Sequence, residues 1–182
     1  HGIHRTMLIR VKGGDYRAKA DSDFFQSLSR ENHIIALDFD GVFSSSHGQK
    51  ARNLRESGYS IRAEDTCSFR MASLGIPREV YVQTSMRAYI DQLLEAPTEP
   101  ELDKFWPKLR DLQSVTIYLV TSRFTHMLDV MVAYLNAKNI DVAGIFNVND
   151  TNKKGVLKLL RPIVYVDDSA HKLYELFEDP ET

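Results

Sequence analysis

The sequence predicts an α/β fold in which a mainly parallel sheet is covered by helices on both faces. Four short runs rich in Val and Ile have the composition of strands that are buried on two sides; they cover residues 33–39, 114–121, 142–148 and 163–168. Helical patterns lie between these runs, as at residues 123–138, where apolar side chains recur at helical spacing. Strands that alternate with helices along a chain build parallel sheets.

The first thirty residues are expected to form an N-terminal extension with a β-hairpin over residues 7–19 and a short helix after it. Gly13 and Gly14 suit a two-residue turn. That turn would place the basic residues Arg10 and Arg17 on one face of the hairpin. The face is either a surface for a phosphate or an acidic partner, or an ordinary solvated face.

A long insertion separates the first two strands. Roughly 75 residues lie between them, which is more than one crossover helix needs. Residues 44–65 are polar and loop-like, whereas residues 78–96 and 98–113 have helical patterns. The expected organisation has three parts. Residues 1–30 form an extension, and residues 31–43 with 101–182 form the core. Residues 44–100 form a small helical cap inserted after the first strand.

Composition excludes several classes of function. The chain has 182 residues, a net charge of -2 and one cysteine, Cys67, so an intrachain disulfide and a cysteine-rich zinc site are excluded. No run approaches the ~18 apolar residues of a membrane-spanning helix. No apolar stretch follows basic residues near the start, so we expect a cytoplasmic protein without a membrane partner. The near-neutral charge argues against nucleic acid as a partner, and the oligomeric state stays open.

Polar side chains follow each predicted strand. Ionised carboxylates are costly to desolvate and repel one another, so Asp38 and Asp40 need a positive partner or an open edge. The carboxyl ends of parallel strands meet at one edge of a sheet. The other strands deliver these residues there: Thr121, Ser122, Lys153, Lys154, Asp167 and Asp168. Carboxylate oxygens with a phosphate suit Mg²⁺, and the hydroxyl and ammonium groups would meet the remaining phosphate oxygens.

Four motifs occur in order along the chain: LDFDGV, YLVTSR, NKKGVLKLL and VYVDDS. Together they resemble the haloacid dehalogenase superfamily of phosphohydrolases, and they span most of the chain, from Asp38 to Asp168. The resemblance implies a Rossmann-like three-layer core, Mg²⁺ as cofactor and an aspartyl-phosphate intermediate. The family's dehalogenases lack an acidic residue two places after the nucleophile, so Asp40 favours transfer of phosphate to water.

The resemblance also implies roles for the acidic residues. Asp38 would be the nucleophile. Asp40 would protonate the leaving oxygen and then activate the hydrolytic water, and its backbone carbonyl would reach the metal. Asp167 would bind the metal directly, and Asp168 would contact it or hold its water shell. The implied metal site is therefore Asp38, Asp40, Asp167 and Asp168, and Gly41 would let the backbone turn closely under the phosphate.

The phosphate-binding residues come from the second and third motifs. Thr121, with Ser122 beside it, would hydrogen-bond a phosphoryl oxygen. Lys154 would balance the charge of nucleophile and phosphate, with Lys153 as the alternative because the local pattern does not decide between them. Arg123 would bind substrate or pair with an acid, and the second interpretation is preferred.

These features predict a magnesium-dependent phosphomonoester hydrolase. The helical insertion and the aspartate pair are similar to those of the deoxyribonucleotidase branch, so a small metabolite such as a nucleoside monophosphate is the first expectation. Arg52, Arg55, Tyr59 and Arg62 would supply specificity from the cap, or form a solvated loop. Alternatives are a phosphatase for phosphoproteins or nucleic-acid ends, a phosphotransferase to an alcohol, and a non-catalytic binding module that retains the fold.

Overall fold

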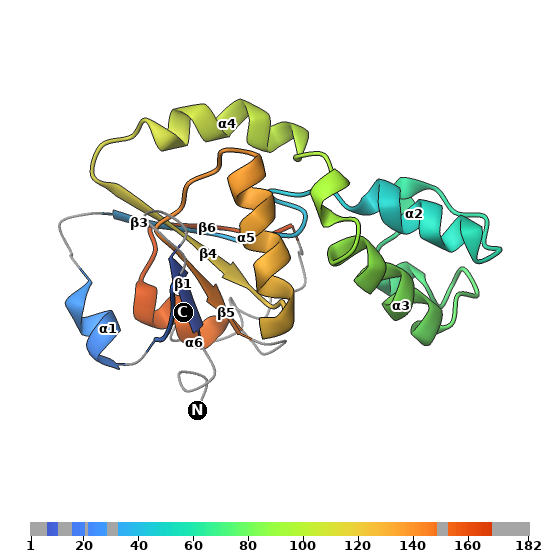
Figure 1. The fold of residues 1–182 in the computed structure, drawn as a ribbon, viewed down its shortest axis with the longest axis horizontal. Helices are drawn as coiled ribbons and strands as arrows, with labels where there is room; N and C mark the ends of the chain where they lie inside the picture. The colour runs from blue at the N-terminus through green and yellow to red at the C-terminus, as the bar shows by residue number, and fades with distance from the viewer. Residues whose placement is uncertain (1–6, 11–15, 21, 29–32, 149–152, 169–182) are drawn as a thin grey trace.

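The computed structural model describes residues 7–10, 16–20, 22–28, 33–148 and 153–168, which form a three-layer α/β core with a helical lobe beside it (Figure 1). The described strands are β1 (Met7–Arg10), β2 (Tyr16–Lys19), β3 (His33–Leu37), β4 (Val115–Thr121), β5 (Gly144–Asn147) and β6 (Val164–Val166). They form one sheet in the order β2-β1-β5-β4-β3-β6. The strands β5, β4, β3 and β6 run parallel, so the predicted fold class is confirmed.

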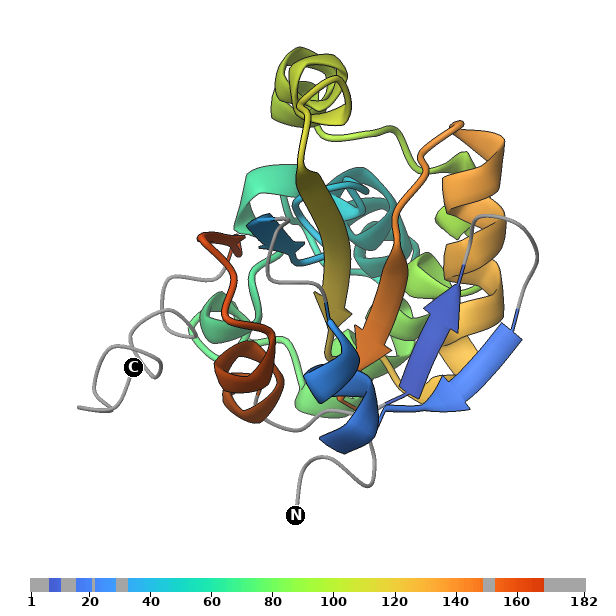
Figure 2. The same ribbon diagram turned by 90° about the vertical axis from the view of Figure 1, so that its left-hand side faces the viewer.

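The hairpin extends the sheet at the β5 edge (Figure 2). Its register places Arg10 opposite Tyr16 and Ile9 opposite Arg17. A two-residue turn at Gly13 and Gly14 would place Arg10 opposite Arg17 instead, so the register and the shared basic face expected from that turn are wrong; the two glycines themselves lie outside the described residues. A shift of one residue exchanges the two faces of a strand. The strand β1 also pairs with β5 on its other side. The prediction considered only the turn and not this second pairing.

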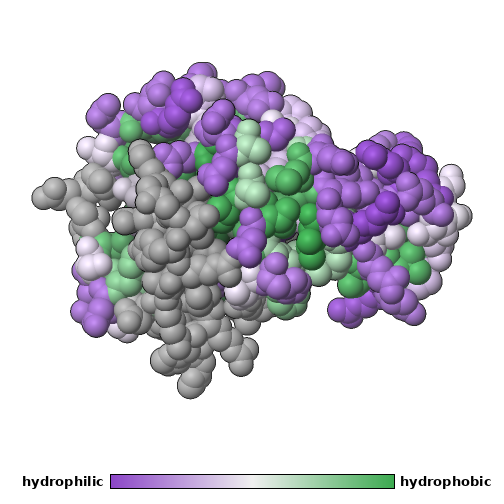
Figure 3. Space-filling model, in the orientation of Figure 1, coloured by the Kyte–Doolittle hydropathy of each residue, from purple (hydrophilic) through white to green (hydrophobic). Residues whose placement is uncertain are grey.

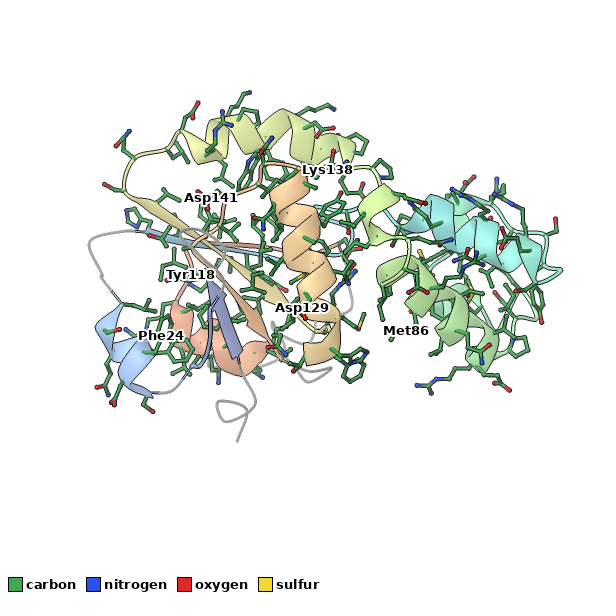
Figure 4. All side chains as sticks on the ribbon, in the orientation of Figure 1. Phe24, Met86, Tyr118, Asp129, Lys138 and Asp141 are labelled. Atoms are coloured by element: carbon green, nitrogen blue, oxygen red, sulfur yellow. The ribbon has the colours of Figure 1, made fainter. Side chains whose placement is uncertain are left out.

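Helices cover both faces of the sheet. The described core helices are α1 (Ser22–Ser27), α4 (Pro100–Arg110), α5 (Leu128–Ala137, preceded by the 3-10 helix η5, Thr125–Met127) and α6 (Lys154–Leu160). Ile35 of β3 packs with α4 and α5 on one face. Ile34, next to it, packs with α1 and α6 on the other, together with Phe24 and Tyr118 (Figure 4). The strands are therefore buried on both sides, as their apolar composition predicts.

The lobe is built from the long insertion. It contains α2 (His47–Glu56), α3 (Arg78–Tyr89) and the 3-10 helices η2 (Ala63–Asp65), η3 (Ser68–Arg70) and η4 (Leu93–Glu95). The prediction of a loop at 44–65 is wrong, because α2 occupies ten of these residues. Only two residues of α2, Ala51 and Leu54, belong to the lobe's own apolar cluster. The spacing of apolar residues that marks a helix is therefore weak in this part of the sequence.

Two chain segments join the lobe to the core, and they run side by side. The N–H of Glu99 donates to the carbonyl of Phe43 at 2.9 Å, and the N–H of Ser45 donates to the carbonyl of Pro97 at 2.9 Å. The chain thus enters the lobe only a few residues after Asp40. The lobe is therefore anchored next to the carboxyl end of β3.

The surface differs between these parts of the molecule. In Figure 3 hydrophilic residues cover α4 and the lobe around α2, and hydrophobic residues gather between them, over α5. The apolar area on this face thus lies at the junction of core and lobe.

Among the helices that the structure describes, none has both the length and the apolar character to cross a membrane.

Candidate active site

The candidate site begins where the central strands end. Asp38 follows β3, and its N–H donates to the carbonyl of Val166 at 2.9 Å, which continues the pairing with β6. Asp167 follows directly after that strand. The strand order reverses here, since the chain runs from β3 to β4 and β5 and then returns to β6 on the other side of β3. Such switch points are where open α/β sheets bind ligands.

Three carboxylates converge at this point. Asp38, Asp167 and Asp168 each offer an oxygen, and these oxygens lie within 4.8 Å of one another. The Lys153 Nζ lies 2.8 Å from Asp38 Oδ1 and 3.1 Å from Asp167 Oδ2. Lys153 thus contributes one positive charge beside these carboxylates, and a divalent cation held by their oxygens would add two more. The all-oxygen donor set fits Mg²⁺. Of the four metal ligands implied by sequence, Asp40 has its carboxylate outside this group.

Gly41 allows Asp168 to take its position. Its φ is +81°, and a Cβ added there would lie 2.0 Å from Asp168 Oδ2. No side chain fits that space, and the positive φ also favours glycine. The close approach at Gly41 that sequence led us to expect is therefore made here to a carboxylate of the acidic group.

Lys153, the alternative to the preferred Lys154, pairs with Asp38 and Asp167 of the acidic group. Lys153 is buried, whereas Lys154 is half-buried. Val156, Leu157 and Leu160 are the buried face of α6. Lys153 precedes them by three, four and seven residues, so it lies on the same face. This spacing is a signal in the sequence that would have decided between the two lysines.

Asp38 is held in an unusual electrostatic state. Burial raises the pKa of its carboxyl from 3.8 to about 7; Lys153 opposes this shift, and the negative charges of Asp167 and Asp40 add to it. Its Oδ1 accepts the N–H of Phe39 at 2.8 Å in addition to the Lys153 contact. Among the described residues Oδ2 accepts no hydrogen bond. A cation beside Asp38 would therefore be needed to keep it fully ionised at neutral pH.

Asp40 is paired with Arg123. The guanidinium donates Nε to Asp40 Oδ2 at 3.0 Å and Nη2 to Oδ1 at 2.9 Å, which confirms the expectation that Arg123 pairs with an acid. Its Nη1 donates to the carbonyl of Tyr89 in the lobe at 2.7 Å. Arg123 is almost fully buried and lies against the ring of Phe39. This arginine thus connects the core site to the lobe.

The predicted hydroxyl groups lie at the end of β4. Thr121 is buried, and its Oγ1 accepts the N–H of Arg123 at 3.2 Å. Ser122 is half-buried beside it. On the neighbouring strand Asn147 is Thr121's Cα partner, and its side-chain Oδ1 is buried without a hydrogen-bond partner in the described chain. A buried polar atom of this kind is uncommon, and the sequence reasoning assigned Asn147 no role.

Lys50 of α2 is a second residue that the sequence reasoning missed. It is 6% exposed, and within the described ranges its ammonium makes no hydrogen bond or ion pair. The Nζ lies 4.4 Å from the ring centroid of Tyr89 and 5.9 Å from that of Tyr81. A desolvated cation–π contact contributes about 2 kcal/mol or somewhat more, whereas burying an ammonium costs several kcal/mol. The tyrosines therefore compensate only part of the cost.

The lobe residues that the sequence suggested for specificity make contacts within the lobe. Arg55 donates to a lobe carbonyl, that of Ile61, at 2.9 Å. Arg62 pairs with Asp65 at 2.9 Å. Arg52 is exposed. Lys50, by contrast, is attracted by the carboxylates of Asp40 and Asp168 in the core.

Compared with family models and with curated proteins, the sequence gives no match. Among solved structures, the chain is similar to a hydrolase from Streptococcus pneumoniae TIGR4, with 12% sequence identity and a TM-score of 0.49. The alignment covers 82% of this chain and 100% of the other. A likeness at this level carries no information on activity, so any function has to be argued from the site residues themselves.

Proposed function

We propose that the chain is a magnesium-dependent phosphomonoester hydrolase in which Asp38 attacks phosphorus. One observation carries the proposal: Asp38 lies buried at the end of the central strand, with Lys153 at 2.8 Å and two further carboxylates close by. A nucleophilic carboxylate needs exactly such positive compensation to react with an anionic phosphate. The aspartate two residues later supplies a group for proton transfer.

Asp38, Asp167 and Asp168 would hold the Mg²⁺. When bound, the ion would offset the negative charge of the carboxylates and of the phosphate. Lys153 supplies a fixed positive charge on the other side of Asp38, because its Nζ contacts both Asp38 and Asp167. The raised pKa of about 7 for Asp38 already includes the opposing effect of Lys153, so the ion would supply the further positive charge that favours the ionised form.

The covalent step belongs to Asp38 Oδ2, the oxygen that accepts no hydrogen bond from the described residues. It forms a bond to phosphorus as the bond to the leaving oxygen breaks, which gives an aspartyl phosphate. Thr121 Oγ1 already accepts the N–H of Arg123. Its own hydrogen is therefore available for a phosphoryl oxygen.

Asp40 would transfer the protons. Both of its oxygens accept one hydrogen bond from Arg123, and each oxygen keeps a second lone pair that can carry the proton for the leaving oxygen. Arg123 can stay in place when this happens, because the carbonyl of Tyr89 also holds it. After the leaving group departs, Asp40 would take a proton from the water that hydrolyses the aspartyl phosphate.

The lobe favours small substrates. The chain enters the lobe a few residues after Asp40. Two lobe residues, Tyr89 and Lys50, lie near Arg123 at the edge of the sheet where the site is. A substrate would have to fit between core and lobe. A small phosphorylated metabolite, with nucleoside monophosphates among the first to test, suits this arrangement better than a folded phosphoprotein.

The test is phosphate release from a panel of phosphomonoesters, with Mg²⁺ or with a chelator. The panel contains nucleotides, sugar phosphates and a phosphopeptide. We expect magnesium-dependent release that Asp38→Asn lowers about a thousandfold or more. Asp111→Asn, which changes an exposed aspartate, is the matched control and should keep full activity.

Release that survives either the chelator or Asp38→Asn would overturn the proposal. Absence of turnover for every member, together with magnesium-dependent binding of beryllium fluoride, would favour the non-catalytic binding module. Transfer to an acceptor alcohol in the same assay would identify a phosphotransferase.

A further inference from the structure

Lys50 carries a buried positive charge that forms no ion pair with a carboxylate among the described residues. It projects from α2 in the lobe, is 6% exposed, and contacts only tyrosine rings among the partners that the structure gives it. Buried charges in proteins are normally paired or hydrogen-bonded. A cation kept in this state is expected where a ligand supplies the missing charge.

The surroundings of Lys50 place it at the edge of the candidate active site. The carboxylates of Asp40 and Asp168 attract its charge, and the guanidinium of Arg123 repels it. The ring of Tyr89 lies against both cations, 4.4 Å from Lys50 Nζ and 5.2 Å from the Arg123 Cζ. Burial lowers the pKa of the Lys50 ammonium, and the two carboxylates oppose this shift. Lys50 is thus close to the site and has no direct partner in it.

The position of Lys50 relative to Asp40 indicates which part of a substrate it would meet. In phosphoryl transfer the attacking and leaving oxygens lie roughly in line on opposite sides of phosphorus. Asp38 and Lys153 mark the attacking side. Asp40, which would protonate the leaving oxygen, marks the other. Of the core carboxylates, Asp40 attracts Lys50 most strongly, ahead of Asp168, which favours the leaving-group side as the place where Lys50 would meet a substrate.

We propose that Lys50 binds a second anionic group on the substrate, a carboxylate or a second phosphate carried by the leaving group. The inference rests on the proposed function, and it narrows the substrate class to phosphomonoesters whose alcohol portion is itself negatively charged. The Tyr89 ring would orient the ammonium, and the anion would complete its neutralisation. A nucleoside is a neutral leaving group, so the Lys50 site ranks nucleoside monophosphates, which the proposed function alone puts among the first to test, below esters of anionic alcohols.

The test compares matched pairs of substrates. Carboxyalkyl phosphates with one, two or three methylene groups are measured beside the hydroxyalkyl phosphates of equal length, and alkanediol bisphosphates form the second-phosphate arm. With Mg²⁺ we expect kcat/KM to favour the best anionic member over its neutral match by about tenfold or more. The carboxylate and bisphosphate arms distinguish the two sources of the anion.

Lys50→Met removes the charge and keeps a side chain that can pack on Tyr89. It should abolish the preference for the anionic member while activity on the neutral one changes little. Lys50→Arg should retain part of the preference, and Lys50→Gln replaces the methionine variant if the latter does not fold. An equal loss on both members would show that Lys50 meets the transferred phosphate itself and would overturn the proposal.

Lys138→Met is the matched control. Lys138 also lies over a tyrosine ring, with its Nζ 5.6 Å from the centroid of Tyr134. It is exposed and follows the end of α5 (Figure 4). Because α5 runs back from the carboxyl end of β4, Lys138 is far from the acidic group. This variant should leave both activity and preference unchanged.

A binding measurement separates this proposal from the proposed function. Calorimetry on Asp38→Asn protein with Mg²⁺ gives the affinity for each member of a pair without turnover. Tighter binding of the anionic member that is lost when Lys50→Met is added supports the Lys50 site. This conclusion holds even if the wild type hydrolyses nothing. In that case only the hydrolase proposal fails. Hydrolysis by the wild type with no preference in rate or affinity overturns the Lys50 site alone.

Discussion

Two lysines in this protein are equally buried and differ in what neutralises them. Lys153 in the core is 5% exposed, and Lys50 in the lobe is 6% exposed. The core lysine has carboxylate oxygens at 2.8 and 3.1 Å, whereas the lobe lysine has tyrosine rings. Burial therefore imposes a similar desolvation cost on both. The difference teaches that burial alone does not decide how a lysine is neutralised: the core lysine is paired with carboxylates of the protein itself, whereas the described lobe residues give Lys50 no such pair.

Lys153→Met should have the largest effect on stability. It leaves Asp38 and Asp167 close together without a cation, and breaking a buried ion pair from one side typically costs about 3–5 kcal/mol. Urea unfolding at pH 8 with a chelator present measures this loss. Mg²⁺ should restore part of it, because the ion would replace some of the missing positive charge.

Lys154→Met is the control for that measurement. Lys154 follows Lys153 in the chain but is only half-buried. The variant should therefore change the free energy of unfolding by less than about 1 kcal/mol. If Lys154→Met were the more damaging of the two, the ion pairs of Lys153 would not be what stabilises the acidic group.

Asp38→Asn should stabilise the metal-free protein at high pH. The pKa of Asp38 is raised from 3.8 to about 7 on folding. The contribution of Asp38 to the free energy of unfolding is therefore fully favourable below pH 3.8, and it is lost as the pH rises through 7. Asparagine does not titrate, so the stability of the variant relative to the wild type should grow between pH 4 and pH 8, by about 4 kcal/mol.

Thermal unfolding across that pH range, with a chelator, checks the sign of the change. Asp111→Asn, at an exposed position, should show no such trend. A variant that is less stable than wild type at pH 8 would mean that the contact with Lys153 outweighs the cost of burying the Asp38 carboxylate.

The two lysines also show how far the sequence predicts the site. The strand ends are predictable, because short apolar runs stop at polar residues and the carboxyl ends of parallel strands share one edge. Lys153 was within reach, since it lies at helical spacing from the buried residues of α6. Lys50 was not, because α2 has a largely polar sequence and its orientation depends on packing inside the lobe. The hairpin register likewise depends on β5, a strand distant in the sequence.

Magnesium binding should release a proton from the core site. With the pKa of Asp38 at about 7 in the metal-free protein, the ion has to displace a proton below that pH. Its affinity should fall by up to about tenfold per pH unit below 7 and level off above 8. Calorimetry at pH 6.5 in two buffers of different ionisation enthalpy counts the protons released. The pH dependence should disappear in Asp38→Asn, and a flat profile in the wild type would contradict the raised pKa.

Lys50→Met should have the smallest effect, and of the opposite sign to Lys153→Met. Replacing an unpaired buried charge by an apolar side chain is often stabilising, but the variant also loses the contact with Tyr89. The expected net gain is about 1 kcal/mol in the ligand-free protein, against no change for Lys138→Met. Because burial lowers the pKa of Lys50, its cost in the folded state, and hence this gain, should shrink as the pH rises toward 10.5. Destabilisation by Lys50→Met at neutral pH would instead show that the tyrosines suffice to hold the ammonium, and the two lysines would then be compensated alike.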